Sequence, residues 1–486
     1  MAVLGSVLTP STTVAQAGER TLSLREAIEA ARSANPDFLA QRNQLGSAAW
    51  QVRSAYGSLV PSVNASNSIG YTATGERRFD SVVLDRQPEI YSSRYSLGMS
   101  LSLNGSTLLA PSVARAQERA TVQQVEGAAA NLEANVTQRY LTVREARDGV
   151  AQAEREVTRV TEHLRLAEAR LEVGAGTQLD VRRAEVQHGQ AEVRLLQAQN
   201  TAANELLLLG QVVGSRLPND VVLTEHFDLF EPVWQVEQLI GVARAENPQL
   251  RASRAQADAA GTRAKAARSM YLPTVSLSAG LSGYVSQAAT VDPMISQELQ
   301  RAGSIYNQCL QQNEIRGAVG LPTAPCADPG LPGVEAQIRD RLMAENRGFP
   351  FDYIRQPASA SITVSIPVFT GLNRQLQVEE ARVARLNAEH EVRAQELQLE
   401  VDVETALRNL QTAYRAALLQ QRIRDTAEQE LALAQERFRL GLATSIEIVD
   451  AQANLAEAER AEIAAVYDFH RSLAALEARL GEPLDR

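Results

Sequence analysis

The chain contains one sequence pattern twice, and this duplication constrains its fold more than any other feature. Asn35-Pro36 precedes Pro61 by the same distance at which Asn247-Pro248 precedes Pro273. In both places the second proline is followed by a segment in which apolar and hydroxyl residues alternate. A long pattern that occurs only twice indicates a tandem duplication and not a solenoid of many short units.

The second half of each copy also matches. In order, Arg170, Gly174, Thr177, Asp180, Ala184 and Gly214 correspond to Arg437, Gly441, Thr444, Glu447, Ala451 and Gly481. The offset is larger here than between the proline pairs, so the second copy carries an insertion between its strands and its next helix. Each copy predicts a helix, strands, a very long helix, a glycine turn and a returning helix.

The repeats divide the 486 residues into five parts. They are a signal-peptide remnant at 1–17, a first repeat at 18–213 with a β-hairpin near 59–104, an inter-repeat linker at 214–235, a second repeat at 236–481 with a β-hairpin near 272–369, and a tail at 482–486. The second hairpin includes a long loop at 287–354 that carries both cysteines.

Composition favours long helices that pack side by side. Aromatic residues make up only 5% of the chain, while Ala, Gln, Glu, Arg and Leu dominate, as in extended helices. The net charge of −10 excludes the basic footprint of a nucleic-acid-binding protein.

Two features bear on the compartment. Ala15-Gln16-Ala17 before Gly18 has the pattern of a signal-peptidase site, although no basic segment precedes it, and predicts export. Cys309 and Cys326 are the only two cysteines. In an exported protein such a nearby pair favours a disulfide, and the alternative is two free thiols.

Four segments alternate strictly between apolar residues and small polar ones, which predicts strands. They lie near 62–69, 96–103, 274–281 and 361–366. A soluble sandwich has the same periodicity, but each segment can supply the roughly 9–11 residues of a tilted membrane strand. Aromatic residues near the segment ends fit an interfacial girdle: Tyr71, Tyr91, Tyr95, Tyr284 and Phe369. Because four strands cannot close a barrel and lipid tolerates no open edge, several chains must contribute to one barrel.

Between the strands, the pattern predicts helices of unusual length. No proline interrupts the sequence after Pro111 until beyond Val173, or from Asn373 to Leu440. About 60 residues at 1.5 Å each span about 90 Å, which indicates a coiled coil. Shorter helices near 24–56 and 236–271 complete the other end of the helical part.

These features together resemble the TolC family of outer-membrane efflux proteins. The resemblance is carried by the duplicated Asn-Pro helices, the segment Ile366-Pro367-Val368-Phe369-Thr370-Gly371 before a long helix, and the turn from Arg437 to Thr444. It covers essentially all of 22–480. It implies a mainly α fold with membrane β: a homotrimer with one 12-stranded β-barrel, four strands per chain, continued by a long antiparallel α-helical coiled-coil tunnel across the periplasm. The family does not predict the long cysteine-bearing loop.

Acidic residues near the second glycine turn are the candidate gate. Glu447 and Asp450 lie three residues apart and share one face of the predicted helix, so a trimer brings six carboxylates to one opening. The resemblance implies that they form the acidic ring of the periplasmic entrance and that Asp180 belongs to the network that holds it shut. The alternative is local: Thr444 with Glu447, and Thr177 with Asp180, have capping-box spacing. Two family residues are missing, an arginine at Ala443 and a tyrosine at Phe438.

The turn tips are candidate contacts for a partner. Their residues are Val173, Gly174, Gly176, Thr177, Leu440, Gly441, Leu442 and Thr444. Apolar tips on a solvated hairpin predict a docking surface. By resemblance the partner is a periplasmic adaptor (membrane fusion protein), which works with an inner-membrane transporter of ABC or RND type. Packing of the tips within the trimer is an alternative that is compatible with docking.

No enzyme chemistry is indicated. The five histidines have no ligand partners at helical spacing, so neither a metal site nor a cofactor is expected. The predicted function is a passive outer-membrane exit duct, in contact with lipid, for a tripartite efflux pump or a type I protein secretion system. A trimeric coiled-coil surface adhesin is the alternative. Two hairpins embedded between helices argue against it.

Overall fold

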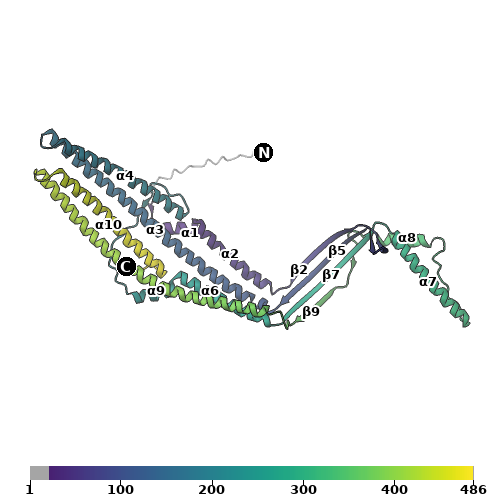
Figure 1. Cartoon of the computed structure of the whole chain (residues 1–486). Helices are drawn as coiled ribbons and strands as arrows, with labels where there is room; N and C mark the ends of the chain where they lie inside the picture. Colours follow the sequence, from purple (N-terminus) through teal and green to yellow (C-terminus); the bar gives the residue numbers. More distant parts are fainter. Residues whose placement is uncertain (1–20, 485–486) are drawn as a thin grey trace, which may run out of the picture. The chain divides into compact units, whose positions relative to one another are not determined.

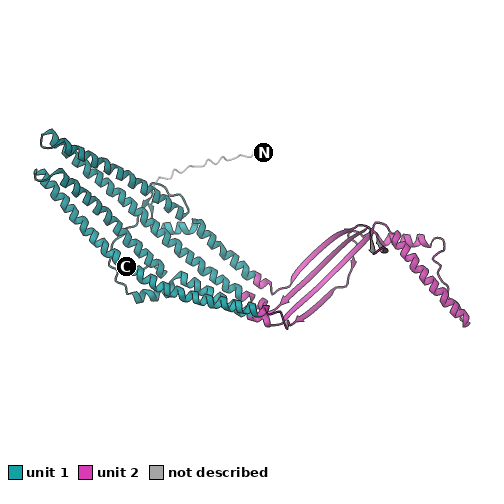
Figure 2. Cartoon of the chain, viewed as in Figure 1, with its two compact units in different colours: residues 1–53, 112–267, 375–486 teal, residues 54–111, 268–374 magenta. Residues whose placement is uncertain are grey.

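The computed structural model describes residues 21–484, and for 76–79 and 82–87 it describes the backbone only. The predicted signal-peptide remnant at 1–17 and the last two residues of the chain lie outside the described residues. The chain forms two compact units, coloured in Figure 2. A helical unit contains residues up to Arg53, Ser112–Ala267 and those from Gln375 onward, and a strand-rich unit contains Ser54–Pro111 and Arg268–Arg374. Both units draw residues from both sequence repeats.

Two long helical hairpins build the helical unit (Figure 1). In the first, α3 (Gly105–Glu172) is followed by α4 (Gln178–Val213); in the second, α9 (Asn373–Arg439) is followed by α10 (Ser445–Leu480). The two long helices have 68 and 67 residues, which confirms the predicted coiled-coil lengths. α3 begins six residues before the predicted Pro111. The Asn104 carboxamide starts it there, because its Oδ1 accepts a hydrogen bond from the Thr107 N–H at 2.8 Å.

Four shorter helices flank the hairpins, and Asn-Pro breaks them in pairs. They are α1 (Leu24–Ala34), α2 (Pro36–Gly57), α5 (Val236–Glu246) and α6 (Pro248–Arg268), the last followed by a 3-10 turn at Ser269–Tyr271. Proline has no N–H and restricts the preceding residue, so one helix ends and another begins at each Asn-Pro.

Each of these asparagines also holds the end of a distant helix. Asn35 accepts from the Phe38 N–H at 2.9 Å and donates through Nδ2 to the Val212 carbonyl at 2.8 Å. Asn247 accepts from the Leu250 N–H and donates to the Arg479 carbonyl, both at 2.8 Å. The same residue type therefore ties the start of each repeat to the C-terminal end of its returning helix.

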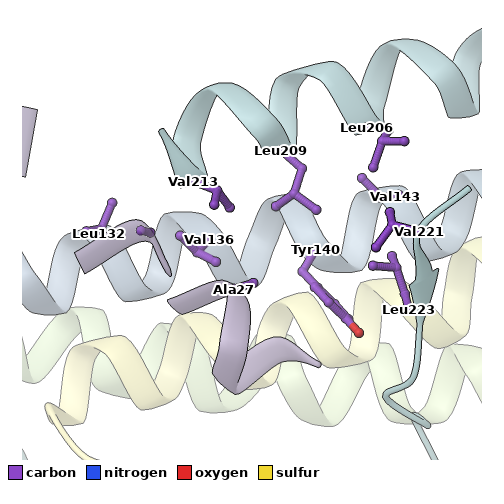
Figure 3. Close-up of a cluster of buried hydrophobic side chains, with 11 residues drawn as sticks. Ala27, Leu132, Val136, Tyr140, Val143, Leu206, Leu209, Val213, Val221 and Leu223 are labelled. Atoms are coloured by element: carbon purple, nitrogen blue, oxygen red, sulfur yellow. The ribbon is translucent and has the colours of Figure 1, made fainter. Parts of the chain in front are cut away.

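The core of the helical unit is divided into equivalent clusters. In the first repeat, Tyr140, Val136 and Leu209 pack with Ala27 and the short strand β6 (Val222–Leu223), as Figure 3 shows. β6 pairs in parallel with β1 (Thr21–Leu22), and the Tyr140 hydroxyl donates to the Leu22 carbonyl at 2.8 Å. The predicted linker 214–235 thus contributes a strand and core residues. A second cluster joins α5, α9 and α10.

The strand-rich unit contains one antiparallel sheet. Its strands are β2 (Ser62–Thr72), β5 (Ile90–Leu103), β7 (Thr274–Ala288), β8 (Ile354–Arg355) and β9 (Ser359–Ser365). The order is β2, β5, β7, with β9 beside one end of β7 and β8 beside the other. All four predicted strands are present. β5 and β7 extend well beyond the predicted alternation, and a small hairpin, β3 (Gly75–Phe79) with β4 (Val82–Gln87), joins β2 to β5.

The register gives the sheet one apolar and one hydroxyl-rich face. Residues opposite one another in the ladder, such as Met99 with Val63 and Ala279, lie on the same face. Polar positions align in the same way. Ser62 and Ser100 hydroxyls lie 3.0 Å apart, and those of Ser278 and Ser361 lie 2.8 Å apart. Hydroxyl rows across neighbouring strands therefore line one whole face.

The predicted loop at 287–354 is largely helical. β7 continues to Ala288, and α7 (Asp292–Ala318) and α8 (Val334–Glu345) follow. The expectation of a loop was wrong because the segment has no repeat partner to guide it. Within α7 only Ile295 is buried, and other apolar side chains such as Ile305 and Ile315 are exposed, so the helix lacks the continuous buried stripe that identifies a packed helix. Cys309 and Cys326 form a disulfide with Cα atoms 5.8 Å apart, which joins α7 to the segment before α8.

Candidate gate at the helical tips

Both hairpins end in the same glycine turn. Gly174 and Gly441 follow the long helices with φ of +76° and +77°, the left-handed conformation that ends helices without steric cost only in glycine. In each turn, the N–H five residues after the arginine donates to the arginine carbonyl: Ala175 N–H to Arg170 and Leu442 N–H to Arg437, both at 2.8 Å. The two tips are thus copies of one structure.

The apolar residues of the tips are exposed. Val173 is 77% exposed, Leu440 61% and Leu442 67%. Gly174, Thr177, Gly441 and Thr444 are also exposed, and Gly176 is half-buried against the Arg170 side chain. This places all the predicted tip residues at the ends of the hairpins.

Two of the three candidate gate acids cap helices. The Asp180 carboxylate accepts from the Thr177 N–H at 3.1 Å and from the Thr177 hydroxyl at 2.6 Å. The Glu447 carboxylate accepts from the Thr444 N–H at 3.2 Å. These bonds satisfy N–H groups that a helix start leaves without partners, and the acids also match the positive end of the helix dipole.

Asp450 has a different environment. It is exposed on α10 and, within residues 21–484, makes no hydrogen bond or ion pair. Glu447, one helical turn away, also pairs with Arg437, whose Nη1 lies 3.3 Å from Oε2. Of the two, Asp450 is therefore the acid that no local structural role explains.

A contact that sequence reasoning missed joins the tips of the two hairpins. Arg170 of α3 donates through Nη1 to the Phe438 carbonyl of α9 at 2.6 Å, and its guanidinium lies 4.2 Å from the centre of the Phe438 ring. A second nitrogen donates to the Ala175 carbonyl at 3.3 Å. The arginine at the equivalent position, Arg437, stays within its own hairpin. The sequence showed only that Arg170 corresponds to Arg437 in the other repeat, and nothing in it indicated the contact with Phe438.

Further from the tips, polar side chains form a line of contacts between α3 and α10, which we call the α3–α10 seam. Glu145 contacts Arg471 and Asp148 accepts from the Tyr467 hydroxyl. Nearer the tips, Glu459 accepts from Arg159 at 2.9 and 2.7 Å and from Gln152 at 3.0 Å. These bonds fix an antiparallel register between helices from different repeats.

Burial sets the electrostatics of the seam. Burial would raise the pKa of the Glu459 carboxyl, but the bonds from Arg159 and Gln152 outweigh it and hold that pKa below its usual value. For Tyr467, burial first and then the Asp148 carboxylate raise the pKa of the phenol. Glu459 is therefore charged and Tyr467 neutral over the physiological range, which suits both to the bonds they make.

His163 lies on α3 between Glu459's partners and Arg170. It is 5% exposed, its ring centre lies 6.0 Å from that of Phe438, and its Nε2 has no hydrogen-bond partner. Burial lowers the pKa of this imidazole, and the Asp180 carboxylate opposes that effect. Gln452 of α10 is another buried side chain whose amide atoms have no hydrogen-bond partner.

Other kinds of site were also sought in the described part of the chain. Residues 21–484 contain no group of three or more His, Cys, Asp or Glu side chains that could hold a metal ion. None of the helices in the same range combines the length and the apolar character needed to cross a membrane.

Comparison with known proteins assigns the family. The family model for outer membrane efflux proteins matches residues 27–215 and 326–482, most of the chain. The chain belongs to the outer membrane efflux protein family. The expected resemblance to TolC is thereby confirmed. The unmatched stretch between the two ranges contains the linker, α5, α6, β7 and α7.

Individual proteins agree with this assignment. The chain is 32% identical over 151 residues to the outer membrane efflux protein BepC of Brucella suis, a match that covers 31% of this chain and about a third (32%) of BepC. Its fold is similar to that of a membrane protein from Pseudomonas aeruginosa, with a TM-score of 0.69, 17% identity and coverage of 99% and 97% of the two chains. The fold is also similar to that of the outer membrane protein VceC of Vibrio cholerae, with a TM-score of 0.66 and 17% identity. This match covers 95% of this chain and 97% of VceC.

This outer membrane efflux protein is therefore located in the outer membrane. Membership of the outer membrane efflux protein family also separates the chain from the alternative of a surface adhesin.

Proposed function

We propose that the protein is the passive exit duct of a tripartite efflux pump or a type I protein secretion system. Three chains form one 12-stranded barrel, each contributing β2, β5, β7 and β9. The observation that carries this proposal is the sheet itself, which has one apolar face, one hydroxyl face and two free edges, one formed by β2 and the other by β9 and the short β8. Lipid tolerates no unpaired strand edge, so neighbouring chains must supply the missing partners.

The apolar face suits lipid and the hydroxyl face suits a water-filled lumen. Ile69, Ile362 and Val364 of the apolar face are each more than 60% exposed in the single chain. Large exposed apolar surfaces mark contact with a membrane or a partner. Membrane barrels have this alternation, with apolar residues outward and polar residues inward.

The helical tips form the periplasmic gate in this proposal. The exposed Val173, Leu440 and Leu442 support docking of a periplasmic adaptor, which couples the duct to an inner-membrane transporter of ABC or RND type. Glu447 and Asp450 of three chains surround the entrance, and Asp180 supports the turn beside it. The Arg170–Phe438 contact joins the two tips of one chain and so favours a closed arrangement. Adaptor binding separates the tips and opens the duct.

The test uses the purified full-length chain in detergent and in planar bilayers. Light scattering should give a trimer, and single insertion events should give equal conductance steps, because each trimer is one pore. A monodisperse monomer, or a trimer that conducts neither alone nor with an adaptor bound to its tips, would refute the proposal. Adding a candidate adaptor should increase conductance if the tips are its docking site.

A further inference from the structure

Two polar residues interrupt the apolar face of the sheet near one end. Asn67 lies opposite Tyr95 in the ladder, and Ser93 lies opposite Ile69 and Val285, so both belong to the face that carries Leu97 and Met99. Unpaired amide and hydroxyl groups facing lipid would each cost several kcal/mol by order of magnitude. Both side chains therefore need a hydrogen-bond partner above the sheet.

Tyr353, from the inserted segment of the second repeat, covers both. Its hydroxyl lies 2.9 Å from the Ser93 hydroxyl and 3.2 Å from the Asn67 Nδ2. Its ring packs edge-on against Tyr95 with centres 4.8 Å apart. Ser93 is only 1% exposed as a result. The polar pair on the sheet and the tyrosine above it thus satisfy each other.

The residues before Tyr353 continue across the same face, and we call residues 346–353 the strap. Asn346 anchors its start, because its side chain accepts from the Ala288 N–H at 2.7 Å and donates to the Ala288 carbonyl at 2.6 Å. At Gly348 a Cβ would lie 2.9 Å from the Val285 side chain, so the backbone passes directly over the sheet. Phe349 then packs on Tyr91 with ring centres 5.7 Å apart.

The strap carries aromatic residues to the edge of the apolar band. Tyr71 and Tyr91 have ring centres 5.2 Å apart, and Phe351, which is 68% exposed, lies beside Tyr353. Phenylalanine and tyrosine at the boundary of a lipid-facing surface match the preference of aromatic rings for the membrane interface. Within this unit, α7 and α8 lie beyond the end of the sheet at which β5 begins and β7 ends (Figure 1). The strap is where the insertion returns to the sheet.

We propose that the strap is a lipid-binding element that lies in the outer-leaflet interface of the membrane. Phe351 inserts between lipid chains, while Tyr353 seals the polar pair beneath it. The inference rests on the proposed barrel, because only there does the apolar face meet lipid. This part of the insertion would thus contact lipid, whereas a surface loop contacts water. The partner is the bilayer itself, contacted by a surface continuous with the apolar face of the strands.

The test measures the environment of a nitroxide label at three positions of similar exposure. Phe351→Cys probes the strap, Ile362→Cys the apolar face of β9 and Ile315→Cys the far part of α7, which are 68%, 72% and 67% exposed. The native cysteines form a disulfide and do not react with the label. In vesicles, the relaxation of each label by oxygen, which concentrates in lipid, is compared with its relaxation by a water-soluble nickel complex.

We expect labels at 351 and 362 to have a high oxygen-to-nickel ratio and the label at 315 a low one. A high ratio at 362 with a low ratio at 351 would overturn the strap proposal alone. A low ratio at 362 would show that the sheet does not face lipid, and the proposed barrel would fail with it. A label at 351 that neither agent reaches would mean that protein covers the strap, which also contradicts lipid binding.

Discussion

The Arg170 guanidinium lies 4.2 Å from the centre of the Phe438 ring and donates a 2.6 Å hydrogen bond to the carbonyl of the same residue. One side chain of the first repeat thus holds both the ring and the backbone of the second. The duplication provides a matched control, because Arg437 occupies the equivalent position and instead pairs with Glu447 in its own hairpin.

Arg170→Ala should therefore favour the open gate. A hydrogen bond from a charged group and a cation–π contact together stabilise the closed tips by about 1.5–3 kcal/mol, so the closed-to-open ratio should fall by about tenfold or more. Single-channel recording would detect a higher open probability. Arg437→Ala removes an exposed pair with Glu447, worth at most about 1 kcal/mol, and a long, exposed hydrogen bond to the Leu442 carbonyl in its own turn, and should have little effect on the contact between the hairpins. Equal effects of the two substitutions would exclude a special role for Arg170.

Stability measurements can distinguish Glu447, which caps a helix, from Asp450, which does not. Glu447→Gln keeps an oxygen acceptor for the Thr444 N–H, while Glu447→Ala loses it and should cost about 1 kcal/mol of helix stability. Asp450→Ala should cost almost nothing, because Asp450 caps no N–H.

The charge of these acids can then be tested without disturbing the fold. The double variant Glu447→Gln with Asp450→Asn removes six carboxylates from the proposed trimeric entrance and should lower cation preference, since rings of one charge sign concentrate counter-ions. Reversal potentials across a salt gradient measure this preference. Unchanged potentials in a correctly assembled trimer would assign both acids to the surface.

Acid should weaken the packing between the tips through His163. Because burial lowers the pKa of this imidazole in the folded state, the unfolded chain binds its proton first as the pH falls. Stability should therefore be unaffected above the ordinary histidine pKa of about 6.5 and should decrease below it. Melting temperatures between pH 7 and pH 5 would show the loss.

His163→Leu should reduce that pH dependence, because it removes the buried proton acceptor and fills its place with apolar atoms. A profile that is the same in wild type and His163→Leu would place the acid-sensitive group elsewhere.

Gly481 should tolerate no side chain. Its φ is +88°, and a Cβ would lie 2.5 Å from the Glu246 carbonyl oxygen at the Asn-Pro break. Gly481→Ala should therefore destabilise the protein by about 2 kcal/mol or more. Gly189 lies within α4 with no atom near its Cβ position, so Gly189→Ala should stabilise it by up to about 1 kcal/mol. In thermal unfolding, the melting temperature should fall for Gly481→Ala and rise for Gly189→Ala.

The features that the sequence predicted are local ones. Alternation located all four long strands, and the spacing of Thr444 and Glu447 predicted a cap that the structure contains. Each depends on residues a few positions apart, where periodicity and backbone stereochemistry determine the outcome. The breaks at Asn-Pro were not predicted, because the short helices were expected to run through both pairs without interruption.

The features that the sequence did not reveal depend on long-range packing. The bonds from Arg159 to Glu459 and from Tyr353 to Ser93 join residues hundreds of positions apart, and no local pattern marks them. The predicted strands were shorter than β5 and β7, because Ser93 and Gly283 interrupt the alternation on which the prediction relied. Tyr353 of the strap gives Ser93 a polar partner, and the Tyr95 ring occupies the space that a side chain at position 283 would need.

The serine rows of the sheet have a consequence for transport. In the proposed barrel a passing molecule exchanges water for hydroxyl groups that both donate and accept, and such exchanges change the free energy little. Arg94 is the one charge that β5 places on this face. A wall of this kind neither retains nor rejects cargo by its chemistry. The choice of what leaves the cell then falls to the proteins that deliver cargo to the duct, and different transporters can share one duct without any change in its lining.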